Sequence, residues 1–354
     1  MPSIKEMLTI AKDAGASDLH LTVGVPPKMR VNGHLITMDF PKMMPQDTEA
    51  LLDEIMTDEQ RQKFEKKGEH DMSFSIAELG RYRVNAYKQR GSVAIALRLV
   101  GTQVPSPEEL GVPGSVIDLY QRKRGLVLVT GPTGSGKSTT LAAIIDKVNN
   151  NRECHVITLE DPIEYLHQHK MSMVNQREIG LDSQSYANAL RAALREDPDV
   201  ILVGEMRDLE TISVAITAAE TGHLVLSTLH TIGAASTVDR VIDVFPPHQQ
   251  QQIRLQLANV LEAVISQQLI PKADGSGRVA AFEVMHANHA VRNLIREGKT
   301  HQLMSVMQTN RKSGMITMDE ALQQLCHEGK IDGKMAIQFA QDPDGMEKKL
   351  LQNF

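Results

Sequence analysis

Eight residues with the sequence GPTGSGKS, positions 131–138, lie between an apolar run at 126–130 and a helix-forming run at 139–148. A strand, a glycine-rich turn and a helix in this order are typical of a phosphate-binding loop, in which backbone N–H groups close around phosphate oxygens. The helix dipole adds partial positive charge at the same place. We therefore expect a nucleoside triphosphate at Gly131, Pro132, Thr133, Gly134, Ser135, Gly136, Lys137, Ser138 and Thr139, with Mg²⁺ at the Ser138 hydroxyl.

The length of the chain, 354 residues, exceeds what one hydrophobic core usually organises. The phosphate-binding loop lies well into the chain, so another domain should precede it. The composition of the segment after residue 100, rich in proline and glycine, is typical of a linker. We predict an α/β protein with an N-terminal domain at 1–100, a linker at 101–115, a nucleotide-binding core at 116–286 and a helical region at 287–354.

The N-terminal domain shows both helical and strand periodicity. We expect helices at 3–14, 47–56 and 58–67, and strands at 18–23, 28–31, 34–38, 70–76, 81–87 and 92–100. The pair Asn32-Gly33 is a hairpin turn signal, and Gly91 separates the last two strands. These patterns predict a small domain built largely from antiparallel hairpins.

After residue 116 the pattern is strand-helix-strand-helix, which predicts a mostly parallel sheet covered by helices. Its strands are continuous apolar runs at 126–130, 156–159, 200–203 and 224–227, and their carboxyl ends should carry the chemistry. We then expect one long helix at 247–266 and a strand at 280–285. A helix at 289–297 would put Val291, Leu294 and Ile295 on an apolar face and leave Arg292 and Arg296 on an exposed basic face.

Three groups beside the loop favour hydrolysis over binding alone. Glu205 follows the strand at 200–203, where a carboxylate can organise Mg²⁺. Glu164 belongs to an acidic segment after the strand at 156–159, and we choose it as the base that orients the attacking water. His223 and His230 bracket the next strand, at positions where an imidazole can donate to a phosphate or respond to its loss.

Composition narrows the class of protein. The formal charge of −6 and the pI of about 6.1 argue against a protein whose main role is to hold nucleic acid or an anionic membrane. No stretch approaches the apolar length of a membrane span, so we expect a soluble cytoplasmic protein. The two cysteines, Cys154 and Cys326, are far apart and show no zinc-binding spacing, so no zinc site is expected.

Four segments together carry a resemblance to a known family. They are the loop, ITLEDPIEY at 157–165, DPDVILVGEMRD at 197–208 and TGHLVLSTLHT at 221–231. In this order they resemble the secretion ATPases of type II secretion and type IV pili, over nearly the whole chain. The segment AVRNLIREGK at 290–299 closely resembles a C-terminal motif of the pilus retraction, or twitching motility, ATPases. Pilus extension and type II secretion ATPases usually have a longer N-terminal region and a four-cysteine zinc element, which this sequence lacks.

The resemblance implies a PAS-like N-terminal domain and a RecA-like core, assembled as a homohexamer that hydrolyses ATP with Mg²⁺. It implies that Lys137 holds the phosphates, that Ser138 and Glu205 form the metal site, and that Glu164 acts on the water. His230, and with less support His223, would sense the γ-phosphate. Arg81, Arg83 and Arg98 would stabilise charge on the nucleotide. The implied partners are an inner-membrane platform protein and the pilus assembly machinery, reached from the cytoplasm at the inner-membrane pilus base.

Other classes of function stay open at this point. A pilus extension or type II secretion ATPase shares most of these motifs. A RecA-like nucleic-acid translocase would share the core, but the acidic charge and the scarcity of aromatic residues count against specific nucleic-acid binding. A small-molecule kinase would need an acceptor pocket and usually an arginine-rich lid, which we do not find in the sequence. A non-hydrolytic switch fits poorly with two acidic strand ends.

Overall fold

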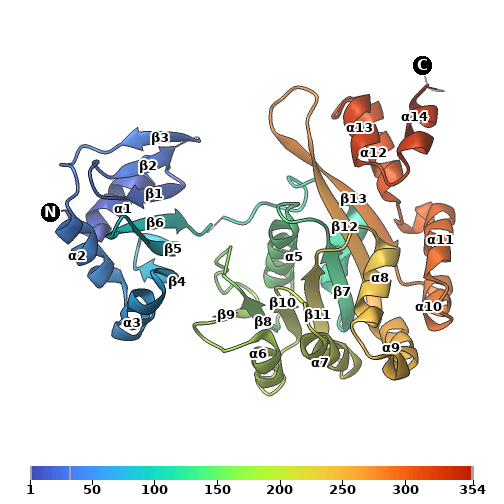
Figure 1. The fold of residues 1–354 in the computed structure, drawn as a ribbon. Helices are drawn as coiled ribbons and strands as arrows, with labels where there is room; N and C mark the ends of the chain where they lie inside the picture. The colour runs from blue at the N-terminus through green and yellow to red at the C-terminus, as the bar shows by residue number, and fades with distance from the viewer. Residues whose placement is uncertain (1, 32, 102, 352–354) are drawn as a thin grey trace. The chain divides into compact units, whose positions relative to one another are not determined.

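The computed structural model describes residues 2–31, 33–101 and 103–351, and it divides between residues 102 and 103 into two compact units. Figure 1 shows both units, with the N-terminal one coloured from blue to teal. The boundaries predicted at 101 and 115 stay predictions, although Val112 is buried in the hydrophobic core of the second unit.

The first unit consists of a six-stranded antiparallel sheet, counted over the described residues, and three helices. Its sheet order is β3-β2-β1-β6-β5-β4. The elements are α1 (Ile4–Asp13), β1 (Asp18–Leu21), β2 (Lys28–Val31), β3 (His34–Thr37), α2 (Pro45–Ile55), α3 (Asp58–Lys67), β4 (Glu69–Ile76), β5 (Gly80–Gln89) and β6 (Ser92–Leu99). The expected β2–β3 hairpin is confirmed, while Asn32 of its predicted turn lies outside the described residues.

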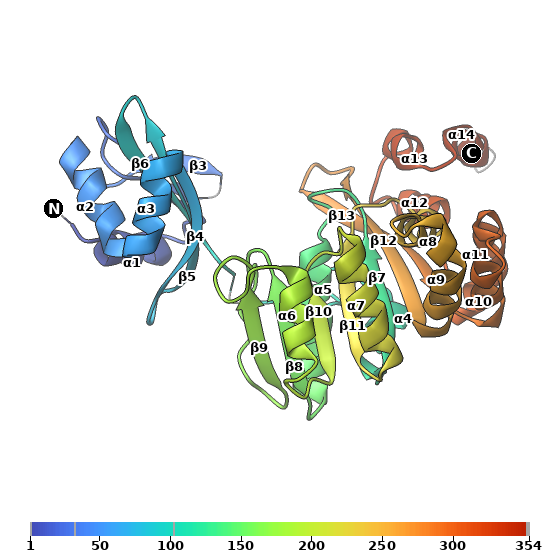
Figure 2. The same ribbon diagram turned by 60° about the horizontal axis from the view of Figure 1, so that its bottom comes forward.

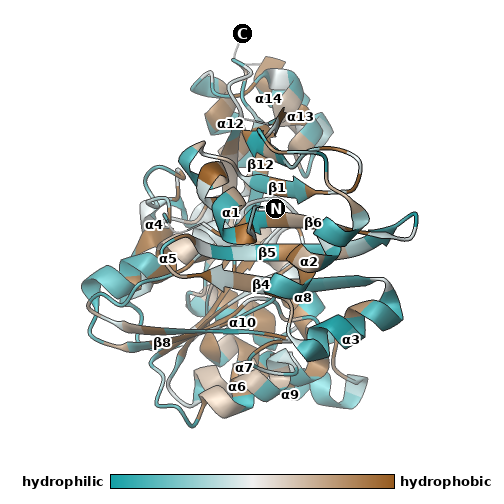
Figure 3. Ribbon diagram, turned by 90° about the vertical axis from the view of Figure 1, so that its left-hand side faces the viewer, coloured by the Kyte–Doolittle hydropathy of each residue, from teal (hydrophilic) through white to brown (hydrophobic). Residues whose placement is uncertain are grey.

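One face of this sheet is buried and the other is polar. Leu19 and Leu21 of β1 are buried, as are Val84 and Ala86 of β5, because alternate residues of a strand point to the same face. The helix α3 is hydrophilic along almost its entire length (Figure 3), and Phe64 is its one buried residue within the described chain. The PAS-like character of this unit stays a prediction.

The second unit begins with a short helix and continues through alternating strands and helices. Its elements are α4 (Gly114–Ile117), η1 (Asp118–Gln121), β7 (Gly125–Thr130), α5 (Lys137–Asn151), β8 (His155–Glu160), β9 (Met173–Glu178), α6 (Tyr186–Ala193), β10 (Val200–Val203), α7 (Leu209–Glu220), β11 (Leu224–Leu229), α8 (Ala234–Asp243), α9 (Pro247–Val260), β12 (Leu261–Pro271), β13 (Arg278–His286), α10 (His289–Arg296), η2 (Thr300–Gln302), α11 (Leu303–Thr309), η3 (Arg311–Ser313), α12 (Met318–His327), α13 (Gly333–Phe339) and α14 (Pro343–Leu351).

The sheet of the second unit has the order β13-β12-β7-β11-β10-β8-β9 over the described residues. All neighbours are parallel except β12 and β13. Leu126 and Leu128 of β7 pack with α6–α11 on one face, whereas Val127 and Val129 pack with η1 and α5 on the other. Figure 2 shows α6 and α7 lying over the strands on the first face and running alongside them. The predicted α/β fold with a mostly parallel sheet is confirmed.

The expected long helix at 247–266 is wrong. The helix α9 ends at Val260, and the chain continues directly as the strand β12, which pairs in parallel with β7. Ala263, Val264 and Ile265 are fully buried between the two helical layers, which is the environment of a central parallel strand. A short apolar run of this kind does not distinguish a buried strand from a buried helix by periodicity alone.

The helix predicted at 289–297 is confirmed as α10, and Val291 and Ile295 are its buried residues. Arg292, however, is not part of an exposed basic face. Its guanidinium donates to the carbonyl oxygens of Ala258 and Asn259 at 2.6 and 2.7 Å, and these are among the last carbonyls of α9. It also forms an ion pair with Glu262 at 3.0 Å. The arginine therefore caps α9 and ties it to α10.

No helix in the described part of the chain combines the length and the apolar character needed to cross a membrane.

We predict that Arg292→Ala lowers the free energy of unfolding by about 1–3 kcal/mol, because it removes charge-assisted hydrogen bonds from carbonyls at a helix end. Arg296 lies one turn later, and its Nη2 donates to the Asn259 side chain at 3.0 Å. Arg296→Ala should therefore cost less than about 0.5 kcal/mol. Urea unfolding followed by circular dichroism measures both variants, and equal losses would contradict the capping role of Arg292.

Candidate nucleotide site

The phosphate-binding loop connects the carboxyl end of β7 to the first turn of α5. Gly131 has φ +141° and Gly136 has φ +89°, so both occupy backbone conformations that residues with a side chain rarely adopt. Pro132, Thr133 and Gly134 are exposed, while Ser135 is buried. The loop thus presents its outer backbone to solvent at the carboxyl edge of the sheet, where ligands bind in open α/β folds.

The loop rests on β12 through Gln267, a residue that the sequence analysis did not single out. A Cβ atom on Gly131 would lie 2.2 Å from the Gln267 carbonyl oxygen, so only glycine fits there. The Gln267 side chain, 3% exposed as a residue, accepts a hydrogen bond from Thr140 of α5 at 2.8 Å. Gln267 could not be found from the sequence, because it directly follows the run predicted to be a helix at 247–266.

Lys137 is 8% exposed and lies over its own loop. Its ammonium donates to the carbonyl oxygens of Gly131 and Pro132 at 2.9 and 3.0 Å. Burial lowers the pKa of Lys137, and the negative charges of Glu205 and Glu164 oppose that shift. The two carboxylates therefore lie within electrostatic reach of the lysine, as predicted from the order of the strands.

The residues of the loop fit a phosphate group. The buried Ser135 hydroxyl has no hydrogen-bond partner among the described residues, which is costly unless a ligand or water supplies one. The exposed backbone at 132–134 lies beside the cationic Lys137 and the N-terminus of α5. Together these groups offer donors and positive charge to an anion, which is the chemistry that a triphosphate requires.

Glu205 follows β10 at the neighbouring strand end. Its Oε1 accepts a hydrogen bond from His230 Nε2 at 2.9 Å and pairs with Arg207 Nε at 2.5 Å. The structure therefore brings Glu205 and His230 together, as the sequence predicted. Arg207 was not predicted, although it lies two residues beyond Glu205. Arg207, which is cationic, and His230, which can be protonated, share one oxygen of Glu205. A further charge placed nearby therefore changes the interactions of this carboxylate.

The acidic segment after β8 contains two glutamates in different environments. Glu160 accepts hydrogen bonds from Thr158 at 2.6 Å and from Gln176 at 3.1 Å, and burial raises its pKa. Glu164 is exposed. A general base must be ionised and have a free oxygen for water. These environments favour Glu164, the residue chosen from the sequence, over Glu160.

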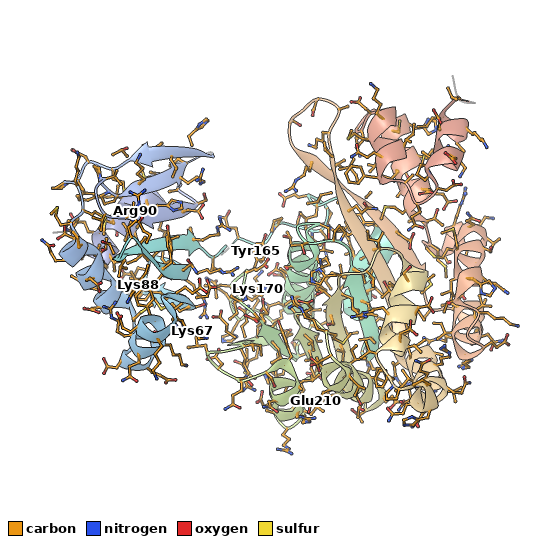
Figure 4. The ribbon with its side chains drawn as sticks, in the orientation of Figure 1. Lys67, Lys88, Arg90, Tyr165, Lys170 and Glu210 are labelled. Atoms are coloured by element: carbon orange, nitrogen blue, oxygen red, sulfur yellow. The ribbon has the colours of Figure 1, made fainter. Side chains whose placement is uncertain are left out.

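The segment that carries Glu164 is attached to α5 at two points. Thr139 and Tyr165 share a hydrogen bond at 3.2 Å between their hydroxyl groups, and Lys170 pairs with Asp146 at 2.7 Å. Figure 4 labels Tyr165 and Lys170 beside α5. Ser138, in the first turn of α5, is exposed. The acidic segment is thus held near the first turn of the helix that follows the loop.

Tyr186 was also missed by the sequence analysis. A Cβ atom on Gly204 would lie 2.9 Å from its hydroxyl oxygen, so this hydroxyl lies at the end of β10. Burial raises the pKa of Tyr186, and the charges of Asp161, Glu205 and Glu160 raise it further. The neutral phenol therefore stands among carboxylates and can donate to one of them.

The structure does not bring His223 to this edge. The Gly125 N–H, at the start of β7, donates to the His223 carbonyl at 3.0 Å. Because β7 and β11 are parallel, His223 lies at the amino edge of the sheet, a strand length away from the loop at the end of β7. Its Nδ1 contacts the carbonyl of Ala218 at 2.9 Å. The expectation that His223 lies among the nucleotide-binding residues is therefore wrong.

The three candidate arginines belong to the first unit. Arg83 of β5 lies directly opposite Arg98 of β6, so both point from the polar face of the sheet, and alternation puts Arg81 on that face too. Arg98 pairs with Asp18 at 2.7 Å. The expected grouping of the arginines is confirmed, and their role toward nucleotide stays a prediction.

No cluster of three or more His, Cys, Asp or Glu side chains in the described chain is arranged to hold a metal ion. Mg²⁺ beside a nucleotide needs few protein ligands, because phosphates and water supply most of its oxygens. The assignment of Mg²⁺ to the Ser138 hydroxyl and the Glu205 carboxylate stays a prediction.

A family model described as type II/IV secretion system protein matches residues 1–341. The chain belongs to this family. Among family members, a type IV pilus retraction ATPase, PilT, of Pseudomonas aeruginosa is 49% identical over 341 residues, covering 96% of this chain and 99% of the relative. A twitching motility protein of Neisseria gonorrhoeae is 50% identical over 320 residues, covering 90% and 86%. The membership confirms the expected P-loop ATPase.

Solved structures of the family have the same fold. A crystal structure of the pilus retraction motor PilT with bound ADP has a TM-score of 0.91 and 50% identity, covering 98% of this chain and 100% of that chain. The Legionella pneumophila ATPase DotB has a TM-score of 0.83 and 30% identity, covering 94% and 93%. The resemblance to the retraction ATPases seen in the 290–299 segment is thereby confirmed.

We predict that Glu164→Gln binds ATP normally but hydrolyses it at least about 10²-fold more slowly, because the amide cannot accept a proton from water. Glu160→Gln is the matched control and should turn over near the wild-type rate, since Glu160 is already engaged by Thr158 and Gln176. Steady-state ATPase assays with a separate nucleotide titration measure both. Normal turnover by Glu164→Gln would place the base elsewhere.

Proposed function

We propose that this ATPase powers the retraction of type IV pili. The observation that carries the proposal is the assembled carboxyl edge, where Glu164 and Glu205 follow two adjacent parallel strands beside a loop whose Lys137 and Ser135 fit phosphate. Near-full-length similarity to a pilus retraction ATPase and to a twitching motility protein supports pilus retraction as the process that ATP hydrolysis drives.

The proposed roles follow from the geometry of each group. Bound ATP with Mg²⁺ would supply a cleavable γ-phosphoryl group and the cation that neutralises its charge. Lys137 and the loop backbone hold phosphate, and Ser138 and Glu205 hold the metal. Glu164 orients water and takes its proton. His230, bonded to Glu205, responds to the charge on the γ-phosphate.

We further propose that the chain works as a homohexamer. Arg81, Arg83 and Arg98 then act on the nucleotide, because a guanidinium can donate two parallel hydrogen bonds to phosphate oxygens. Their grouping on one exposed sheet face supports this role. In this proposal the ring works in the cytoplasm, at the base of the pilus. Its partners there are an inner-membrane platform protein and the pilus assembly machinery.

The test is pilus retraction in living cells that lack this gene. Fluorescently labelled pili should retract when the wild-type chain is restored, and should extend without retracting when Glu205→Ala is supplied. Glu205→Ala should remain assembled as a hexamer by mass photometry, because the substitution removes a carboxylate that pairs with His230 and Arg207 at a strand end. Retraction at the wild-type rate in the deleted strain, without complementation, would contradict the proposed function.

A further inference from the structure

A single buried carboxylate joins three segments that are distant in sequence. Glu283 of β13 is 3% exposed. Its Oε1 accepts a hydrogen bond from the Ala234 N–H at 2.7 Å. Its Oε2 accepts one from the Met318 N–H at 3.0 Å and another from the Gln341 side chain at 3.1 Å. β13 contacts both α8 and α12, the helices that begin at the first two of these donors (Figure 1).

The charge of Glu283 is stabilised by helix ends and not by a cation. Ala234 and Met318 are the first residues of α8 and α12, where N–H groups have no partner within the helix. A carboxylate at a helix N-terminus also interacts favourably with the helix dipole. Burial raises the pKa of Glu283, and its three donors oppose that shift. Within the described chain, no ion pair is formed by this side chain, so its hydrogen bonds alone determine its position.

One side of this junction is the segment that follows His230. The Gly233 N–H donates to the Ser266 hydroxyl at 3.0 Å, and Thr231 and Thr237 share a hydrogen bond at 2.7 Å. Gly233 has φ +90°, and a Cβ atom there would lie 3.2 Å from the Gln341 amide nitrogen. The segment 231–234 is therefore fixed to β12, α8 and Glu283, immediately after the histidine that contacts Glu205.

The other side of the junction is the C-terminal helical region. Asp319 of α12 accepts hydrogen bonds from the backbone N–H groups of Gln341 and Asp342 at 2.7 and 3.1 Å. The helices α12–α14 share a small hydrophobic core of their own, to which β12 and β13 contribute Ile270 and Ala281. Glu283 thus forms the polar connection between these helices and the segment next to the nucleotide site.

We propose that Glu283 is a positioning residue that couples His230 and Glu205 to the helices α12–α14. This inference rests on the proposed nucleotide site. A shift of the 230–234 segment on nucleotide binding or cleavage moves the Ala234 N–H, and Glu283 transmits that shift to the first turn of α12 and to Gln341. In the reverse direction, displacement of the C-terminal helices changes the position of His230.

The test is Glu283→Gln, which keeps the size of the side chain but replaces one acceptor by an NH₂ group facing an N–H donor. We expect kcat for ATP to fall by about 10- to 100-fold, as misplacement of a catalytic group by a distant mutation can do. KM for ATP should stay within about twofold, because the phosphate-binding loop is unchanged. Hydrogen exchange should show that a non-hydrolysable ATP analogue no longer changes protection at 317–322 and 341–346, although it still protects 131–139.

The matched control is Glu320→Gln. Glu320 caps the same helix, accepting from the Thr317 N–H at 3.1 Å, and it pairs with Arg311. Within the described chain, no hydrogen bond or ion pair joins it to residues 231–234. It should keep wild-type kcat and the wild-type effect of the analogue. Equal effects in both variants would mean that Glu283 is only a helix cap, and this would overturn the proposal. Wild-type kcat and wild-type hydrogen exchange in Glu283→Gln would also overturn it.

A second variant covers the case in which Glu283→Gln fails to fold. Gln341→Ala removes one of the three donors to Glu283. It should lower kcat, and it should weaken the change in hydrogen exchange at 317–322 that the analogue causes. Both effects should be smaller than those of Glu283→Gln. An unchanged response in this variant would overturn the proposal. If the analogue does not protect 131–139 in the wild type, the proposed nucleotide site itself fails, which is distinguishable from failure of the coupling alone.

Discussion

The close contact between the phosphate-binding loop and β12 is the constraint on which the rest of the site depends. The backbone of Gly131 lies against the Gln267 carbonyl so closely that no side chain fits between them. The Thr140–Gln267 hydrogen bond then fixes the first turns of α5 to the same strand. The exposed residues of the loop lie at the carboxyl edge of the sheet, where β8 and β10 also end. The position of Lys137 relative to the carboxylates follows from this packing.

Parallel strand order brings the remaining groups to one edge. β10 lies between β8 and β11, so the acidic segment, Glu205 and His230 follow three adjacent strands. The Gly204 N–H donates to the Leu159 carbonyl at 2.7 Å, and Thr228 donates to the Gly204 carbonyl at 2.6 Å. These bonds hold the three strand ends in register. The Glu205 carboxylate is therefore placed by backbone contacts and oriented by His230 and Arg207.

The sequence predicted the loop, the parallel strands and most of the site because each depends on local pattern. A glycine-rich turn between an apolar strand and a helix has few structural interpretations other than a phosphate-binding loop. The carboxyl ends of parallel strands meet at one edge of the sheet because of its topology. Gln267 and Glu283 could not be predicted in this way, since their importance comes from contacts between distant segments. His223 was misplaced because both histidines that flank β11 were assigned to the nucleotide, although His223 precedes the strand and therefore lies at its amino end. Arg292 looked exposed because helical periodicity does not reveal that another helix ends beside it.

The central claim is that Lys137 and its loop bind the phosphates of ATP. Calorimetric titration with ATP tests it most directly in Lys137→Ala. The control on the same helix is Lys147→Ala, because the Lys147 ammonium pairs with Glu108 at 3.7 Å on the surface. We expect at least about tenfold weaker binding by Lys137→Ala, because the substitution removes charge-assisted hydrogen bonds to phosphate. Lys147→Ala should bind as the wild type does, with both variants folded by circular dichroism. Equal affinity of Lys137→Ala and wild type would contradict the account.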